Sequence, residues 1–230
     1  MNIILTPAIP DGYQYRLSPN KNLDELTYLN MLTDDIIHYL RESFKDTPFI
    51  TITRLTGPTD QILARLQTLT QTTPPSSNRI VAVGLNSTRM DGHYHTGSGW
   101  RVISNPESSQ SSALATSLAT AAMQTLGPRA AATSPQPNAI RYLNQTPILT
   151  ATAIPAVLTL NLYQDNRQDA ANLLSSVSRQ AIIDLHVKGI SDYLNSLSPA
   201  DCPAIHPASP HHNPRHHRTG SAGSQHSTPR

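Results

Sequence analysis

Two histidines separated by one residue are the first feature of this sequence with the residue types and spacing for metal chemistry. His93 and His95 lie in the string GHYHTG. Side chains two positions apart in an extended segment point the same way. Together with a carboxylate, they would supply two imidazoles and one carboxylate, a ligand set that binds zinc in proteins. The same string is also typical of two surface histidines on a loop, which is the interpretation that we prefer.

More histidines lie near the carboxyl end, in a segment rich in Pro, His, Ser and Gly that has no acidic residue after Asp201. They are His206, His211, His212, His216, His217 and His226. Histidine-rich tracts can bind transition metals, but this composition is also typical of a disordered, weakly cationic extension. We expect residues 198–230 to be a disordered tail.

An acid and a histidine also occur close together as Asp184 and His186, in a segment dominated by Ile and Leu. The apolar residues of this segment recur at helical spacing, which predicts a helix. We expect Asp184 and His186 to lie on the exposed face or edge of that helix and not to form a catalytic dyad.

The composition restricts the class of protein. A chain of 230 residues is long enough for one domain with a core plus a tail. A net charge of +2 and a charged fraction of 14% give no electrostatic reason to expect nucleic-acid binding. The single cysteine, Cys202, excludes an intramolecular disulfide and a cysteine-based zinc knuckle. The sequence has no signal-peptide pattern and no apolar run of about 20 residues, so we expect a cytoplasmic protein that reaches the cell envelope only if released.

The elements that must position any site alternate along the chain. Strands are predicted at residues 2–6, 49–53, 80–83, 100–103, 140–143 and 155–160, and helices at residues 24–44, 59–69, 111–126, 165–174 and 178–194. This alternation predicts a single α/β domain over residues 1–197, with a mainly parallel, twisted sheet of about five to six strands and helices on both faces.

The string PAVLTLNLYQDN reads as a buried strand that runs into a polar turn, and Leu160 lies where we expect that strand to end. In open α/β sheets, ligands bind beyond the carboxyl ends of the strands. Leucine at this place offers neither a nucleophile nor a proton acceptor.

Several strings occur in an order that resembles a known family. They are SPNKNLDEL, IVAVGLNS, GSGWRV, PAVLTLNLYQDN and QAIIDLHVKGISDYL. The chain resembles the zinc-dependent N-acetylmuramoyl-L-alanine amidases, which cut the amide bond between the lactyl group of muramic acid and the first stem-peptide residue of peptidoglycan. The resemblance implies a zinc ion bound by two histidines and a glutamate, with an open position for water and substrate, and a second glutamate as general base.

Three of these four positions differ here. The first histidine of the family, in an Asp-Pro-Gly-His-Gly string, matches Ile9, and the second, in Ile-His-Ala-Asn, matches Gly84. The ligand glutamate matches Glu25, whereas the catalytic glutamate of Leu-Thr-Glu-Asn matches Leu160. Isoleucine and glycine side chains have no lone pair, and leucine is no base. For Glu25 itself, a carboxylate that complements the helix dipole at an exposed helix start is an alternative to a ligand.

We therefore expect a catalytically degenerate amidase-like protein that acts as a regulatory module or as a module that binds peptidoglycan or muropeptides. We expect it to hold no cofactor. The residues that this alignment leaves near the cleft are Glu25, Arg16, Asn86, Ser98 and Asn161. The alternative is an active zinc amidase with a rearranged site at Glu25, His93 and His95, and a third interpretation is a divergent product without a wall function. The oligomeric state stays open.

Overall fold

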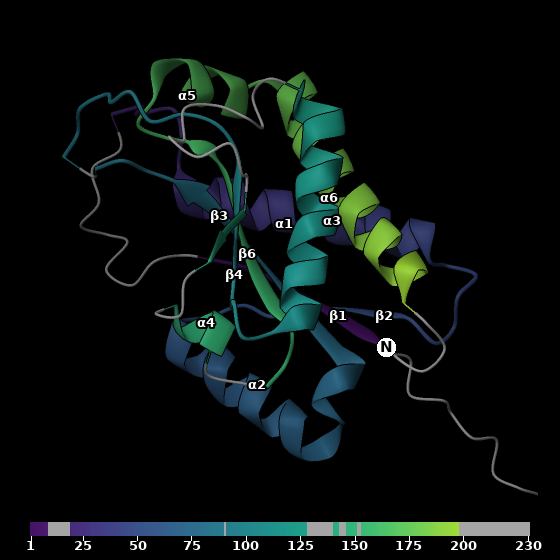
Figure 1. Ribbon diagram of the computed structural model, residues 1–230. Helices are drawn as coiled ribbons and strands as arrows, with labels where there is room; N and C mark the ends of the chain where they lie inside the picture. The colour runs from purple at the N-terminus through teal and green to yellow at the C-terminus, as the bar shows by residue number, and fades with distance from the viewer. Residues whose placement is uncertain (9–18, 90, 128–139, 143–145, 151–152, 198–230) are drawn as a thin grey trace, which may run out of the picture.

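The described residues form a six-stranded sheet in the order β2-β1-β3-β6-β4-β5 (Figure 1). The structure is a computed structural model, and it describes residues 1–8, 19–89, 91–127, 140–142, 146–150 and 153–197. The expected tail at residues 198–230 lies outside these ranges. The strands are β1 (Asn2–Pro7), β2 (Thr51–Arg54), β3 (Asn78–Asn86), β4 (Arg101–Ser104), β5 (Ile140–Tyr142) and β6 (Ala156–Tyr163). Every pairing is parallel except that of β4 with β6.

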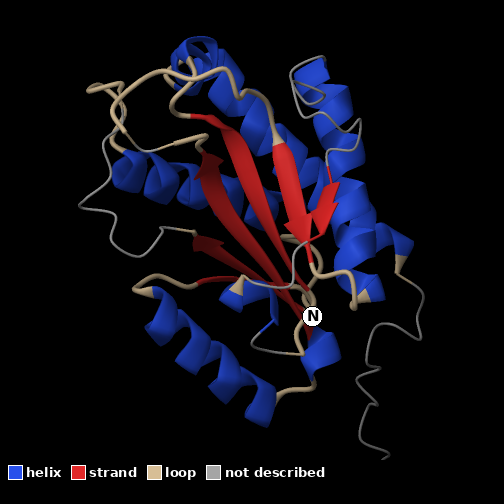
Figure 2. Ribbon diagram, turned by 60° about the vertical axis from the view of Figure 1, so that its left-hand side comes forward, coloured by secondary structure: helices blue, strands red, loops and turns tan. Residues whose placement is uncertain are grey.

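Helices cover both faces of the sheet (Figure 2). One core cluster joins the sheet to α1 (Glu25–Ser43), α3 (Ser109–Leu126) and α6 (Ser176–Ser196), and a second joins it to α2 (Thr59–Thr72) and the short α4 (Pro147–Thr150). A 3-10 turn (Pro75–Ser77) precedes β3, and α5 (Arg167–Leu173) precedes α6. The predicted α/β class, with a mainly parallel sheet and helices on both faces, is confirmed.

The helix starts follow from their capping residues. Asp24 caps α1, since its carboxylate accepts from Thr27 N at 2.7 Å. Asn166 caps α5 and accepts from the backbone N–H groups of Gln168 and Asp169. Side-chain caps satisfy N–H groups that have no partner within the helix. These caps fix where the two helices begin relative to the strand ends.

The sheet differs from the prediction at two strand ends. β3 continues through Gly84 to Asn86, and β6 continues through Leu160 to Tyr163. A glycine and a polar asparagine read as turn signals in sequence, but here the ladder runs past them with a bulge between Gly84 and Asn86. Leu162, just beyond, has a φ of 63°, a left-handed conformation that leucine rarely adopts. The bulge and this residue end the regular register.

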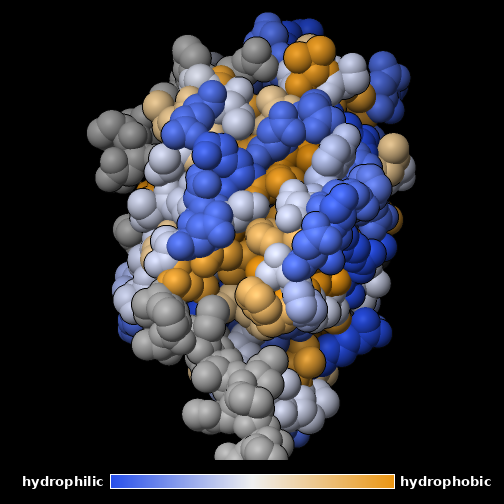
Figure 3. All heavy atoms as spheres, turned by 90° about the vertical axis from the view of Figure 1, so that its right-hand side faces the viewer, coloured by the Kyte–Doolittle hydropathy of each residue, from blue (hydrophilic) through white to orange (hydrophobic). Residues whose placement is uncertain are grey.

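The surface mixes apolar and polar side chains. The side that lies on the right of Figure 1 shows apolar areas broken up by hydrophilic residues (Figure 3). None of the helices within the described ranges has the length and apolar character to cross a membrane.

Candidate functional site

Gly84 and Leu160 face each other across two neighbouring strands. They are register partners in the parallel β3–β6 pair. A Cβ added at Gly84 would lie 3.3 Å from Leu160 Cδ2 and 3.5 Å from Ala8 Cβ. Ala8 follows β1, and its N–H donates to Val83 O at 2.8 Å. The sequence positions aligned with the second zinc ligand and the general base of the amidases are thus neighbours at the carboxyl-terminal half of the central strands.

The surroundings of Leu160 are aliphatic. Leu158 and Leu160, both half-buried, pack against the core cluster under α2 and α4. They line a pocket of about 250 Å³, which is bounded by the end of β1, the start of α2 and α4. The described residues of its wall are Pro7, Ala8, Gly57, Thr59, Ile62, Leu85, Thr146, Pro147, Ile148, Leu158 and Leu160. No ionisable side chain occurs among them.

Glu25 lies in the first turn of α1 and is 2% exposed. Its place in the first turn agrees with the interpretation as a helix-start carboxylate, but the expectation that this helix start is exposed is wrong. α1 packs into the core cluster that it shares with α3 and α6, whereas Leu160 packs against the cluster on the other face. A glutamate at the start of a helix is normally solvated, so its burial has no signal in the sequence.

Asn161 follows Leu160 and is fully buried. Its Oδ1 accepts from Trp100 Nε1 at 2.9 Å, and its Nδ2 donates to Gly84 O at 3.1 Å. The side chain therefore ties β6 to β3 and to the residue that precedes β4. Its amide is occupied by protein partners at both ends.

His186 was expected on an exposed face or edge of α6, and this expectation is wrong because the side chain is fully buried. Its Nδ1 lies 2.7 Å from Ile182 O, and its Nε2 lies 2.9 Å from Thr159 Oγ1. A carbonyl oxygen only accepts, so Nδ1 carries the proton and Nε2 accepts from the threonine hydroxyl. Burial lowers the pKa of His186 from 6.5 to about 4. Asp184 is exposed and accepts from Gln180, so it forms no dyad with His186.

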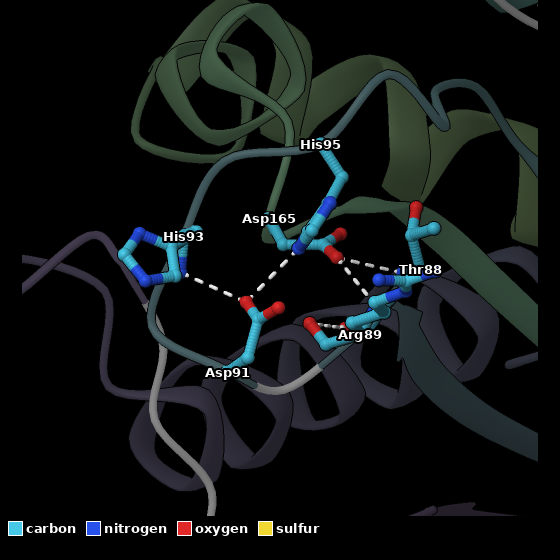
Figure 4. Close-up of polar contacts among 7 residues, drawn as sticks. Thr88, Arg89, Asp91, His93, His95 and Asp165 are labelled. Atoms are coloured by element: carbon cyan, nitrogen blue, oxygen red, sulfur yellow. Dashed lines mark hydrogen bonds and ion pairs between the residues drawn. The ribbon is translucent and has the colours of Figure 1, made fainter.

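The loop histidines contact an aspartate (Figure 4). His95 Nε2 lies 2.9 Å from Asp91 Oδ1, and His93 N donates to the same oxygen at 3.0 Å. The hydrogen bond with His95 lowers the pKa of Asp91 below its usual value. Among the described residues, no three His, Cys, Asp or Glu side chains are close enough to hold a metal ion. The structure thus does not bring Glu25, His93 and His95 together.

The remaining predicted contact residues are dispersed. Asn86 ends β3, is 8% exposed, and accepts from Ser87 N at 3.0 Å. Ser98 is half-buried in the loop before β4. Ile9 and Arg16 lie outside the described residues.

Two further aspartates, which the sequence did not lead us to predict, hold the loop between β3 and β4. Asp165 Oδ2 accepts from the backbone N–H groups of Thr88 and Arg89, at 2.7 and 2.9 Å (Figure 4). Asp169 Oδ2 accepts from Gly99 N at 2.7 Å and from Tyr163 N at 3.0 Å. Both are buried. Asp165 has a signal in the sequence, because it is an acidic residue two positions after a buried strand, whereas Asp169 lies within α5 and has none.

Comparison with known proteins gives matches among solved structures. No protein-family model matches the chain. No curated protein matches it either. The catalytic domain of CwlV, an N-acetylmuramoyl-L-alanine amidase from Bacillus (Paenibacillus) polymyxa, superposes with a TM-score of 0.63 at 17% identity, over 84% of this chain and 98% of that one.

Two further amidase structures agree with it. The N-acetylmuramoyl-L-alanine amidase from Clostridium difficile 630 gives a TM-score of 0.64 at 15% identity, over 86% of this chain and 98% of that one. Ami1, the amidase from Mycobacterium smegmatis, gives 0.64 at 17% identity over the same shares of the two chains. At these identities the likeness is one of fold. This chain therefore has the fold of the catalytic domains of N-acetylmuramoyl-L-alanine amidases.

Proposed function

We propose that this protein binds peptidoglycan or muropeptides through an amidase fold that has lost its hydrolytic centre. The observation that supports this best is the register pair Gly84–Leu160. Both residues stand at positions that match functional residues of the amidases. The side chains of Ala8, Leu158 and Leu160 all lie within 3.5 Å of the point where a Cβ at Gly84 would be. An aliphatic cluster thus occupies the place where the resemblance implies a metal ligand and a base.

The side chains at the aligned positions do not fit a zinc ion. Gly84 supplies no donor, and Leu160 Cδ2 already lies within 3.3 Å of where its Cβ would be. Ile9 has no lone pair. Glu25 is then the one donor of the implied set, whereas zinc sites in proteins are bound by three or four N, O or S ligands.

The base is missing as well. A positioned general base contributes about 10²- to 10⁴-fold to a hydrolytic rate. With Leu160 in its place and no metal to acidify a water molecule, hydrolysis falls to near background. A rearranged site would require Glu25, His93 and His95 to converge. Instead, His95 bonds to Asp91, and among the described residues no three His, Cys, Asp or Glu side chains lie close enough together to hold a metal ion.

The proposed binding function rests on the fold and on the solved structures that share it, which are N-acetylmuramoyl-L-alanine amidases. Polar residues that the alignment places near the cleft are the candidates for contact with a sugar or peptide. Asn86 is nearly buried and Asn161 fully so, which makes Arg16 and Ser98 the better candidates for direct contact. Release from the cytoplasm during lysis would bring the protein to the wall.

A pull-down on insoluble peptidoglycan sacculi tests this function. Full-length protein is expected in the pellet, and soluble muropeptides should compete it away. Arg16→Ala should weaken retention, whereas Lys188→Ala, which removes a cation paired with Asp192 on α6, should not. Protein that stays entirely in the supernatant would contradict wall binding and favour a divergent product without that function.

A further inference from the structure

We infer that the pocket beside Leu160 is a binding site for an uncharged apolar group, aliphatic or aromatic, and not for a sugar or a charged ligand. The pocket lies beside the carboxyl end of β1 and the middle of β6, between the sheet and the helices α2 and α4. Crevices at the carboxyl ends of parallel strands are the usual ligand sites of open α/β sheets. This inference goes beyond the proposed wall binding and does not depend on it.

The size of the pocket admits a small ligand or a side chain of a larger one. Its volume is about 250 Å³. An engineered cavity of about 150 Å³, lined by Leu, Ile and Phe, binds benzene in another protein. The pocket therefore has room for an apolar group larger than a benzene ring, but it is smaller than a typical drug-sized site.

The chemistry of the wall selects against polar ligands. Its described side chains are aliphatic except for two threonines, Thr59 and Thr146. A sugar ring placed here would bury several hydroxyls with at most two side-chain partners, and each buried polar group without a hydrogen bond is unfavourable. A charged group would find no counter-ion among the described wall residues. An uncharged apolar group, in contrast, gains from every Å² that it removes from water.

The two half-buried leucines supply the apolar surface that such a ligand would contact. Leu158 and Leu160 present aliphatic surface to the pocket and are only partly covered by the rest of the described chain. Gly84 contributes by leaving room, because a Cβ there would lie 3.3 Å from Leu160 Cδ2, close enough that the leucine would have to shift by a few tenths of an ångström. The same two substitutions that remove the donor and the base therefore shape an apolar wall.

The test uses full-length protein and toluene as the apolar probe, with N-acetylglucosamine as the polar one. Binding is followed by the shift in melting temperature and by saturation-transfer NMR, since a ligand that binds the folded state raises the melting temperature. Toluene should raise the melting temperature of the wild-type protein and give a saturation-transfer signal. N-acetylglucosamine should not compete with toluene.

Two variants alter the pocket in different ways. Thr146→Asp places a charge at the wall, and it should fold because Thr146 directly precedes α4, where Asp caps a helix as well as Thr does. We expect toluene to bind it about tenfold more weakly or worse. Leu158→Phe fills the space and should reduce binding as well. Thr120→Asp, the same change at an exposed site on α3, should behave like the wild type.

The inference is overturned if toluene leaves the wild-type protein unaffected, or if Thr146→Asp and Leu158→Phe both respond to toluene as strongly as Thr120→Asp does. Neither result bears on retention by sacculi. Retention on sacculi without toluene binding would contradict the apolar binding site but not the proposed wall binding. Toluene binding without retention on sacculi would contradict the proposed wall binding but not the apolar site.

Discussion

Gly84 on β3 and Leu160 on β6 are cross-strand partners, and a Cβ at position 84 would lie 3.3 Å from Leu160 Cδ2, so the leucine side chain would have to give by a few tenths of an ångström. The two residues are therefore sterically coupled. A side chain at position 84 and a leucine at position 160 exclude each other unless one of them moves.

This coupling is measurable as a double-mutant cycle. Gly84→Val should destabilise the protein by about 1–3 kcal/mol, the usual cost of overpacking. In a Leu160→Ala background the same change should cost less, because the contact that it creates is gone, with a coupling energy of at least about 0.5 kcal/mol. Urea unfolding of the four proteins gives the values. Leu69→Ala changes a partly buried leucine of the same cluster and is the control. Its effect on the free energy of unfolding should simply add to that of Gly84→Val.

Gly189 on α6 is a second glycine that leaves no room for a larger residue. A Cβ there would lie 2.8 Å from Leu118 Cα on α3, and Ser117 Oγ donates to Gly189 O at 2.8 Å. In an exposed helix, Gly→Ala stabilises by up to about 1 kcal/mol. Here Gly189→Ala should instead destabilise by about 1–3 kcal/mol, because α3 must move away.

A second substitution, at the contact residue Leu118, shows whether the clash involves the backbone of α3. Leu118→Ala should relieve only part of the cost of Gly189→Ala, since the backbone of Leu118 stays in place. Full recovery of stability in the double variant would contradict the close approach of the two helices.

His186 predicts a loss of stability on acidification. Its folded-state pKa, about 4, is below the value of 6.5 for an exposed histidine, so between these values the unfolded state binds more protons. The stabilisation is complete above pH ~6.5 and decreases as the pH falls toward 4, by up to about 3 kcal/mol in all. Urea unfolding between pH 7 and pH 4 measures this.

His186→Gln keeps a polar side chain but does not titrate. It should be less stable than the wild type at pH 7 and should lose less stability on acidification. If both proteins lose stability equally over this range, another group is responsible.

Asp169 is expected to hold the loop at residues 87–99 to the end of β6. Asp169→Asn removes the charge from a carboxylate that accepts from Gly99 N and Tyr163 N. It should cost about 1–3 kcal/mol and speed hydrogen exchange at Gly99. The matched change Asp192→Asn, at an exposed ion pair on α6, should cost at most about 1 kcal/mol. Equal protection of Gly99 in both variants would count against this role.

The fold was predictable because most of its elements carry the period of their type. The apolar stripe of α1 and the buried runs of β1, β3 and β6 are readable in sequence. The end of β6 was not, because Asn161 looks like a turn residue until its amide is seen to bond across the sheet to Gly84. α4 was missed because four residues that start with proline carry no period.

The candidate site was predictable only in part. Its location in the carboxyl-terminal half of the central strands follows from the positions of Gly84 and Leu160, whereas the burial of each side chain depends on the partners that the fold supplies. His186 is buried because Ile182 O and Thr159 Oγ1 lie beside its two ring nitrogens. Nothing in the order of residues around His186 indicates that Thr159, on a different strand, will be its partner. The same holds for Glu25, whose helix start is covered by other parts of the chain.

The most direct test of the proposed loss of hydrolysis is an assay of amide cleavage with the full-length protein, defined muropeptides and added zinc. Release of free stem peptide is measured by mass spectrometry, with an active N-acetylmuramoyl-L-alanine amidase as the positive control. We predict release no faster than in the blank without protein, with or without zinc. Zinc-dependent release that disappears in Glu25→Ala or His93→Ala, but persists in Lys188→Ala, would contradict the account.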